Sequence, residues 1–272
     1  MLIDTHCHLD AAEFDADRPE VAAHALAAGI GAIVIPAVER ANFGVVRDLA
    51  RRTAGGAYAL GIHPLYVERA DEGDLRALRE AVQDALDDPR FVAIGEIGLD
   101  FFVPEIASGA PRERQEHFYA AQLALAAEFG LPVLLHVRKS QDILLKHLRR
   151  HGRIGGIAHA FNGSAQQAQA FVDLGFALGM GGAMTYERAL QIRRHATDMA
   201  LEHLVLETDA PDIPPAWLHP PDRRNRPGEL ARIADTLAQL RGLTPEQVAG
   251  ATTANALRVL PRLADGIRDS RD

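Results

Sequence analysis

Short runs of apolar residues recur along the chain and predict eight β-strands. Runs such as Gly31–Ile35 are apolar at every position, a pattern typical of strands whose two faces are both buried. The predicted strands are Met1–Asp4, Gly31–Ile35, Ala57–Ile62, Val92–Ile97, Pro132–His136, Gly156–Ala158, Phe176–Met180 and Leu204–Glu207.

Longer stretches with helical periodicity lie between these runs. The clearest is Arg112–Glu128, in which Phe118 and Leu125 fall on the apolar side of the predicted helix. Ser164 stands where a helix N-cap is expected, and Thr244 begins the spacing of a capping box with proline at the first helical position. The other predicted helices are Asp74–Asp87, Ser164–Leu174, Tyr186–Thr197 and Glu229–Arg241.

The alternation of buried strands with helices predicts an α/β fold with a parallel sheet covered on both faces. Eight such units in a chain of 272 residues match a closed (β/α)8 barrel, the TIM barrel. A doubly wound open sheet is the alternative. No linker or change of composition divides the chain, so we expect a single domain over residues 1–272.

Composition limits the classes of protein to which the chain can belong. Hydrophobic residues make up 47% and charged residues 24%, which is typical of a soluble enzyme and not of a disordered chain. The single cysteine, Cys7, excludes a disulfide framework and favours a reducing compartment. With no signal-peptide pattern and no apolar run long enough to span a membrane, we expect a cytoplasmic protein without membrane association.

The formal net charge of −8 argues against non-specific coating of nucleic acid. It does not exclude a substrate that carries phosphate, because bound cations can reverse the field inside a site. The sequence indicates no obligate protein partner.

Polar residues gather at the ends of the predicted strands. His6 and His8 close the first run, and residues two apart on a strand point to the same side. Active sites of (β/α)8 barrels lie at the C-terminal ends of the strands, and buried imidazoles and carboxylates are costly unless they pair or bind metal. The residues at or just past strand ends are His6, His8, His63, Glu96, His136, His159, Glu207 and Asp209. Their convergence predicts a binuclear hydrolase site, with ions about 3.5–4 Å apart.

Six motifs spread over most of the chain resemble those of the TatD family of metal-dependent hydrolases, within the amidohydrolase-like barrels. They are Asp4-Thr5-His6-Cys7-His8-Leu9, Gly61-Ile62-His63-Pro64, Gly95-Glu96-Ile97-Gly98-Leu99-Asp100, Leu135-His136-Val137-Arg138, His159-Ala160-Phe161-Asn162-Gly163 and Leu206-Glu207-Thr208-Asp209-Ala210-Pro211. The resemblance implies hydrolase activity, with metal-dependent deoxyribonuclease action in well-known members. It also implies metal ligation by His6, His8, Glu96, His136, His159 and Asp209.

Two segments depart from the family pattern. Arg224-Asn225-Arg226-Pro227 stands where many members have Arg-Asn-Glu-Pro, and Phe101-Phe102-Val103-Pro104 replaces a common Tyr-Tyr-Arg. Both lie in the region expected to face substrate, so they affect the choice of substrate and not the metal chemistry. They are typical of a distinct subgroup, whose natural substrate is not assumed to be DNA.

Two carboxylates are the predicted catalytic residues. Glu96 is the candidate to bridge two ions, since a carboxylate offers two oxygens where an imidazole offers one nitrogen; its alternative role is an ion pair with an arginine. Asp209 is expected to contact a metal and to accept the proton of the attacking water. Its alternative role is to cap the turn before Ala210-Pro211.

Other residues are candidates for binding substrate or supporting the metal ligands. His63, Arg138, Asn162 and Arg224 are the predicted substrate-binding residues, with a structural role or a solvated loop as the alternative. Glu207 is expected to orient a ligand by hydrogen bonding. Aromatic side chains that could stack on a base are Phe101, Phe102 and Trp217.

The predicted function is a metal-dependent hydrolase, most simply a TatD-like deoxyribonuclease that cleaves phosphodiester bonds with a metal-activated water. An ester or amide hydrolase, such as an aminoacyl-tRNA deacylase or a small-molecule amidohydrolase, is the alternative, and a non-catalytic metal-binding protein is a third. The expected cofactors are divalent cations, two per chain. Imidazole ligands favour zinc and oxygen ligands favour magnesium or manganese, so the sequence does not decide the identity of the metal. Nucleophile-elbow, P-loop and CxxC motifs are absent, and no other cofactor is indicated.

Overall fold

Eight parallel strands form one sheet in sequence order in the computed structural model, which describes residues 1–269. The strands are β1 (Leu2–Asp4), β2 (Ile30–Pro36), β3 (Gly56–Leu60), β4 (Phe91–Asp100), β5 (Val133–Arg138), β6 (Gly156–Ala158), β7 (Phe176–Met180) and β8 (Leu204–Leu206). Each predicted strand corresponds to one of these. β4 runs past its predicted end at Ile97, because Gly98, Leu99 and Asp100 continue the pairing with β5.

The first and last strands of the sheet are joined by hydrogen bonds at their C-terminal ends. The backbone N–H of Thr5 donates to the carbonyl of Leu206 at 3.1 Å, and the Thr5 hydroxyl donates to the same oxygen at 3.0 Å. The predicted (β/α)8 barrel is therefore confirmed, and the doubly wound open sheet is excluded.

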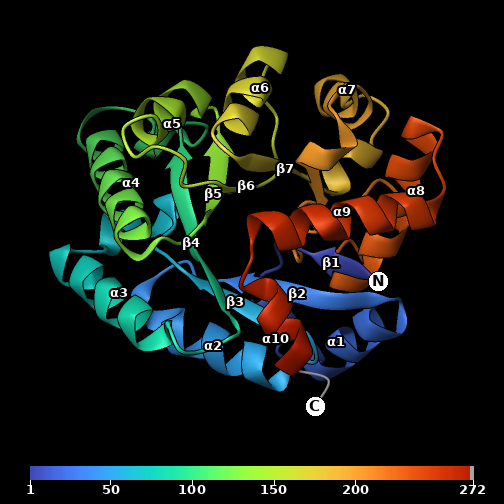
Figure 1. The fold of residues 1–272 in the computed structure, drawn as a ribbon, viewed down its shortest axis with the longest axis horizontal. Coiled ribbons are helices and arrows are strands. Elements are labelled where there is room, and N and C mark those ends of the chain that lie inside the picture. Colours follow the sequence, from blue (N-terminus) through green and yellow to red (C-terminus); the bar gives the residue numbers. More distant parts are fainter. Residues whose placement is uncertain (270–272) are drawn as a thin grey trace.

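Helices follow the strands and surround the sheet (Figure 1). They are α1 (Arg18–Ala27), α2 (Phe43–Arg52), α3 (Glu72–Ala85), α4 (Gly109–Phe129), α5 (Gln141–Leu148), α6 (Ala165–Asp173), α7 (Leu190–Asp198), α8 (Leu230–Arg241), α9 (Pro245–Val259) and α10 (Leu263–Asp269). Short 3-10 turns lie in the connections at Ala12–Phe14, Arg40–Asn42, Pro64–Arg69, Pro104–Ile106, Gly182–Thr185, Leu201–His203 and Pro227–Glu229.

The predicted helix starts agree with the structure at both capping signals. The hydroxyl of Ser164 accepts from the backbone N–H of Gln167 at 3.1 Å, and that of Thr244 accepts from Gln247 at 3.3 Å. The helix predicted to begin at Tyr186 begins instead at Leu190, because a 3-10 turn precedes it and the Tyr186 hydroxyl is bonded to the carbonyl of Pro214.

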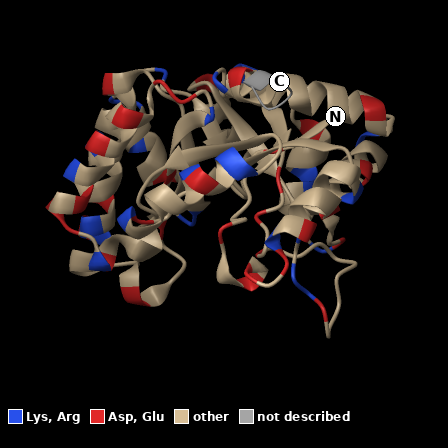
Figure 2. Cartoon of the chain, turned by 90° about the horizontal axis from the view of Figure 1, so that it is seen from below, with Lys and Arg blue, Asp and Glu red and all other residues tan. Residues whose placement is uncertain are grey.

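One end of the barrel is closed by the C-terminal helices. Figure 1 shows α9 and α10 in front of the strands, inside the ring of the other helices. The buried core of the barrel interior combines small and branched residues of the strands with side chains of this C-terminal segment: Ile3, Ala32, Val34, Ala57, Ala59, Val92, Ala93, Leu134, Ile157, Ala177, Val205, Ala256, Val259, Leu260, Leu263 and Ile267. Long loops extend from the opposite end, away from the two termini, and carry acidic and basic residues (Figure 2). Since β1 begins beside the N-terminus, the strands finish at this loop-bearing end.

None of the helices within residues 1–269 has both the length and the apolar character needed to cross a membrane.

Replacing Leu260 by alanine tests the closure of the barrel. Leu260 is fully buried in the core shared with the strands, so Leu260→Ala is expected to lower the free energy of unfolding by about 2–5 kcal/mol. Leu26 on α1 is 51% exposed, so Leu26→Ala should change it by no more than about 0.5 kcal/mol. Urea denaturation measures both, and equal values for the two variants would contradict a core closed by the C-terminal segment.

Candidate metal centre

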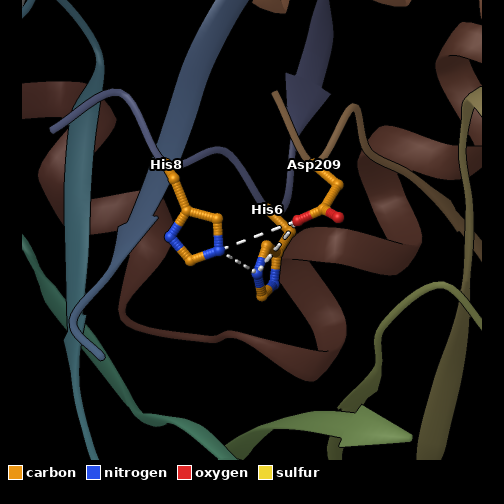
Figure 3. Close-up of side chains that lie close together, drawn as sticks. All are labelled: His6, His8 and Asp209. Carbon is orange, nitrogen blue, oxygen red and sulfur yellow. Dashed lines mark hydrogen bonds and ion pairs between the residues drawn. The ribbon is translucent and has the colours of Figure 1, made fainter. Parts of the chain in front are cut away.

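Three side chains that follow the first and the last strand of the sheet point toward one another (Figure 3). His6 and His8 follow β1, and Asp209 follows β8. The backbone N–H of Asp209 donates to the carbonyl of His6 at 2.9 Å, which holds the two segments side by side. The Nε2 atoms of His6 and His8 lie 3.3 Å apart, and Asp209 Oδ1 lies 3.8 Å and 3.7 Å from them. The two histidines thus converge as predicted, although β1 already ends at Asp4.

Glu96 lies at the centre of the imidazoles and is 2% exposed. Its Oε2 is 3.2 Å from His6 Nε2 and 3.4 Å from His8 Nε2. Its Oε1 is 3.1 Å from His136 Nδ1 and 3.4 Å from His63 Nε2. Each carboxylate oxygen therefore faces a different pair of histidines.

His159 connects this centre to a second buried carboxylate. Its ring stacks on that of His6, with centroids 3.8 Å apart. Its Nε2 is 3.4 Å from Asp209 Oδ1, while its Nδ1 is 3.0 Å from Glu207 Oε1. Glu207 also accepts from the backbone N–H of Ala160 at 2.6 Å, so the position of its carboxylate is fixed.

Further carboxylates support the cluster from behind. Asp100 Oδ2 lies 2.9 Å from His136 Nε2, the nitrogen that faces away from Glu96. Asp4 accepts from the hydroxyl of Thr208 at 2.6 Å and from the backbone N–H of His6 at 3.3 Å. The contact of Asp100 fixes the tautomer and the orientation of an imidazole ligand, and those of Asp4 fix the backbone beside His6.

The carboxylates stay ionised because of the imidazoles around them. Burial raises the pKa of Glu96, but the surrounding imidazoles, His63 and His6 first, and a hydrogen bond from His136 lower it well below the ordinary value. Burial also raises the pKa of Asp209, and the charge of His159 outweighs this and lowers it.

The imidazoles divide into two groups. Burial lowers the pKa of His6 and that of His63, the latter to about 4, so both rings are neutral near pH 7. Burial opposes the charged form of His8 as well, but the hydrogen bond and charge of Glu96 raise its pKa to about 9. The pKa of His159 is also raised well above its usual value, despite burial, by the charges of Glu207 and Asp209. Protons on His8 and His159 therefore supply positive charge to the site.

Left-handed backbone follows three of the strands at this end. Lys139, Ala160 and Asp209 have φ angles of 55°, 43° and 58°, which residues other than glycine seldom adopt. Such backbone is frequent at functional sites, where it aims side chains that an ordinary turn would direct elsewhere. Asp209 is one of these side chains.

The donor set fits a divalent cation. Imidazole nitrogens and carboxylate oxygens are all electron-pair donors, and groups of three lie with their donor atoms within 4.8 Å of one another. These groups are His6, His8 and Asp209; His6, Glu96 and His159; and His63, Glu96 and His136. Buried donors at such distances need protons or cations between them. Imidazole and carboxylate together are ligands of zinc and of other first-row divalent metals.

Comparison with known proteins agrees with this geometry. Residues 3–261 match the family model of TatD-related DNases. The chain belongs to the TatD family. It is 39% identical to the uncharacterized metal-dependent hydrolase YjjV of Escherichia coli K12, over 93% of this chain and 95% of that protein. The crystal structure of YjjV matches with a TM-score of 0.88, covering 96% of this chain and 98% of the other.

Two further TatD-family relatives carry names that state an activity. A 3'-5' ssDNA/RNA exonuclease TatD of Klebsiella pneumoniae is 34% identical over 93% of this chain and 95% of that protein. The human deoxyribonuclease TATDN3 is 30% identical over 96% of this chain and 95% of that protein. The chain is thus a TatD-family metal-dependent hydrolase, as the motifs predicted.

The cluster opens into a cleft of about 1150 Å³ at the loop-bearing end of the barrel. Three of the four predicted substrate-binding residues, His63, Arg138 and Asn162, line this cleft. His63 lies deeper than expected, because its Nε2 contacts Glu96. Its Nδ1 accepts from the backbone N–H of Leu65 at 3.2 Å, so the proton of the neutral ring is on Nε2.

Arg224 is not among the residues that line the cleft. Its Nη1 donates to Asp17 Oδ1 at 2.8 Å, and the guanidinium lies 5.1 Å from the centre of the Phe14 ring. The ion pair lowers the pKa of Asp17. The substrate role of Arg224 stays a prediction, and the geometry favours its alternative, a structural role in the loop after β8.

Of the three aromatic candidates, Phe102 lines the cleft. Phe101 packs against the core under Arg112, whose guanidinium carbon is 4.1 Å from the ring centre. Trp217 donates from Nε1 to Glu229 at 2.6 Å and lies under Arg232. Neither Phe101 nor Trp217 is among the residues that line the cleft, and both rings have packing contacts instead.

Three supporting residues were not identified from the sequence as parts of the site. Asp100 lies within a quoted motif, but its contact with His136 depends on the pairing of β4 with β5. Lys139 lines the cleft beside Arg138. Asn225 is fully buried and donates from Nδ2 to the carbonyls of Thr208 and Asp212, both at 2.8 Å, which fixes the loop that carries Asp209.

Replacing Glu207 by glutamine tests the support of His159. Because an amide holds a ligand imidazole less strongly than a carboxylate does, Glu207→Gln is expected to weaken divalent-metal binding about 10- to 100-fold. Competition with a chelator of known affinity measures the change. The control is Glu202→Gln, whose side chain is 74% exposed and which should leave affinity unchanged. Equal affinities for wild type and Glu207→Gln would show that Glu207 does not support a metal ligand.

Proposed function

We propose that this protein hydrolyses phosphodiester bonds of single-stranded nucleic acid, with DNA as the first substrate to test. The observation that carries the proposal is the position of Asp209 Oδ1. It lies within 3.8 Å of the Nε2 atoms of His6, His8 and His159, at the mouth of an open cleft. A carboxylate in this position can both contact a cation and accept a proton from a water in the cleft.

The residues proposed to hold two divalent cations are His6, His8, Glu96, His136, His159 and Asp209. Glu96 would be a ligand in either half of the cluster, because its two oxygens face different histidines. When bound, the cations supply an acidified water and polarise the scissile phosphoryl group. Zinc, magnesium and manganese remain the candidates.

The side chains of this chain supply the remaining steps. Asp209 is ionised at neutral pH, since its pKa is lowered, and it takes the proton of the attacking water. The bond from the water oxygen to phosphorus forms as the bond to the opposite ester oxygen breaks, and the departing oxygen takes a proton from solvent. Arg138 neutralises charge on the phosphate oxygens, and the Nε2–H of His63 can donate a hydrogen bond to an oxygen of the substrate.

The choice of substrate rests on the relatives that are named nucleases and on the basic residues at the cleft. Residues 1–272 are proposed to form one hydrolase domain, in keeping with a family match over residues 3–261. The cytoplasmic location stays a prediction from the sequence.

A parallel assay tests the reaction class. Labelled single-stranded DNA, an aminoacyl ester and a dipeptide-like amide are each incubated with the protein and with magnesium, manganese or zinc. We expect nucleotides to be released from DNA and release to stop on chelation. Cleavage of the ester or amide alone would contradict the proposal and favour the ester or amide hydrolase predicted as the alternative.

Asp209→Asn tests the proton acceptor. An amide cannot take the proton of water at neutral pH, so kcat on DNA is expected to fall at least about 100-fold. Circular dichroism and the unfolding midpoint should remain near those of the wild type. Asp84→Asn is the matched control, because Asp84 is exposed on α3, and it should retain full activity. Activity near that of the wild type in Asp209→Asn would contradict the role.

A further inference from the structure

Phe102 is an exposed aromatic ring at the wall of the cleft. Its exposed fraction is 48%, whereas Phe101 beside it packs on the core. A large apolar side chain exposed in a cleft indicates a binding role, since contact with a ligand can replace its contact with water. Phe102 belongs to the segment in which this chain departs from the family's Tyr-Tyr-Arg pattern.

Two cations lie over this ring. The guanidinium carbon of Arg138 is 3.9 Å from the ring centre, and Lys139 Nζ is 4.9 Å from it. Arg138 is the last residue of β5, and Lys139 follows it with left-handed backbone. The side chain of Arg138 is 48% exposed, so its nitrogens remain accessible to a second partner.

The charge of the cleft is divided between its walls. Among the described residues that line it, Arg138 and Lys139 carry the permanent positive charges, and both lie beside Phe102. Asp10, Glu13 and Asp212 also line the cleft; they follow β1 and β8, which in the order of the eight strands lie across the barrel from β4 and β5. A polyanion that reaches the metal centre therefore has favourable electrostatic contacts along the side of Phe102 and unfavourable ones opposite.

Asp100 ties this ring to the metal centre. Its Oδ1 accepts from the backbone N–H of Phe102 at 2.8 Å and from that of Val103 at 3.1 Å. Its Oδ2 lies 2.9 Å from His136 Nε2 and 3.7 Å from Arg138 Nη1. One buried carboxylate thus fixes the backbone that carries Phe102 and also contacts Arg138 and a proposed metal ligand, which keeps this segment beside the reacting centre.

We propose that Phe102, Arg138 and Lys139 form a nucleotide subsite, in which a base of single-stranded nucleic acid stacks on the Phe102 ring while Arg138 and Lys139 bind the adjoining phosphate. The subsite rests on the proposed nuclease function and adds to it the residues that hold the strand next to the scissile bond. An exposed flat ring with neighbouring cations binds any base, because each base has a π-face. The subsite therefore gives affinity for single strands with little choice of sequence.

Binding of two matched strands tests the stacking. One probe is a fluorescein-labelled, phosphorothioate-linked oligothymidylate, and the other has the same linkages with abasic units in place of the nucleosides. Anisotropy in magnesium buffer gives Kd without turnover. We expect Phe102→Ala to raise Kd for the first probe about ten-fold and to leave Kd for the abasic probe unchanged. Phe102→Trp should keep the affinity, and Phe102→Leu, apolar but not flat, should behave as Phe102→Ala.

Salt dependence tests the two cations. Each phosphate contact on a single strand contributes about 0.7 to the slope of log Kd against log salt concentration. Arg138→Gln and Lys139→Gln are each expected to lower this slope by about that amount. Lys146→Gln on α5 and Val45→Ala on α2, both exposed and outside the cleft, are the matched controls and should change neither slope nor Kd.

The outcomes separate the subsite from the proposed function. If the wild type cleaves DNA but Phe102→Ala weakens both probes equally, or neither, the stacking role is overturned while the nuclease proposal stands. If the wild type neither binds nor cleaves the strands, the nuclease proposal fails and the subsite fails with it.

Discussion

The structure depends on a convergence of electron-pair donors at one end of a barrel. Glu96 is almost fully buried and ionised, and its two oxygens face four imidazoles within 3.4 Å. A buried carboxylate is strongly unfavourable without positive charge close by. Protons on His8 and His159 supply positive charge in this cluster, and the ring nitrogens are the proposed ligands of divalent cations. Membership of the TatD family connects this arrangement of charges with metal-dependent hydrolysis.

The fold supplies both the rigidity and the opening that such a site needs. Parallel strands finish at one end, and the bonds from Thr5 to Leu206 bring the first and last strands together, so that His6 and Asp209 become neighbours although far apart in sequence. At the other end, α9 and α10 close the core, which leaves the C-terminal ends of the strands as the end with the cleft. Buried carboxylates behind the imidazoles, Asp100 and Glu207, then fix the rings through their outward nitrogens.

Much of the fold could be predicted from the sequence, because each strand is a continuous apolar run and the number of strand–helix units is that of a (β/α)8 barrel. The residues at strand ends could be predicted as a cluster for the same reason, since parallel strands place their ends together. What could not be predicted depends on side-chain geometry. Arg224 is basic and near the last strand, but its loop turns it toward Asp17 and away from the cleft. Asp100 supports His136 only because β4 continues beyond its apolar run. Phe102, and not Phe101 or Trp217, lines the cleft, on a segment whose backbone N–H groups bind the Asp100 carboxylate.

Anomalous X-ray scattering from crystals of the manganese- or zinc-loaded protein tests the central claim most directly. A difference map at the metal's absorption edge locates bound ions without reference to activity or substrate. The donor geometry predicts strong peaks among His6, His8, Glu96 and Asp209, and loss of these peaks in crystals of a His6→Ala, His8→Ala double variant with the same fold. Peaks confined to other parts of the molecule, or no peak at this end of the barrel in the loaded wild type, would contradict it.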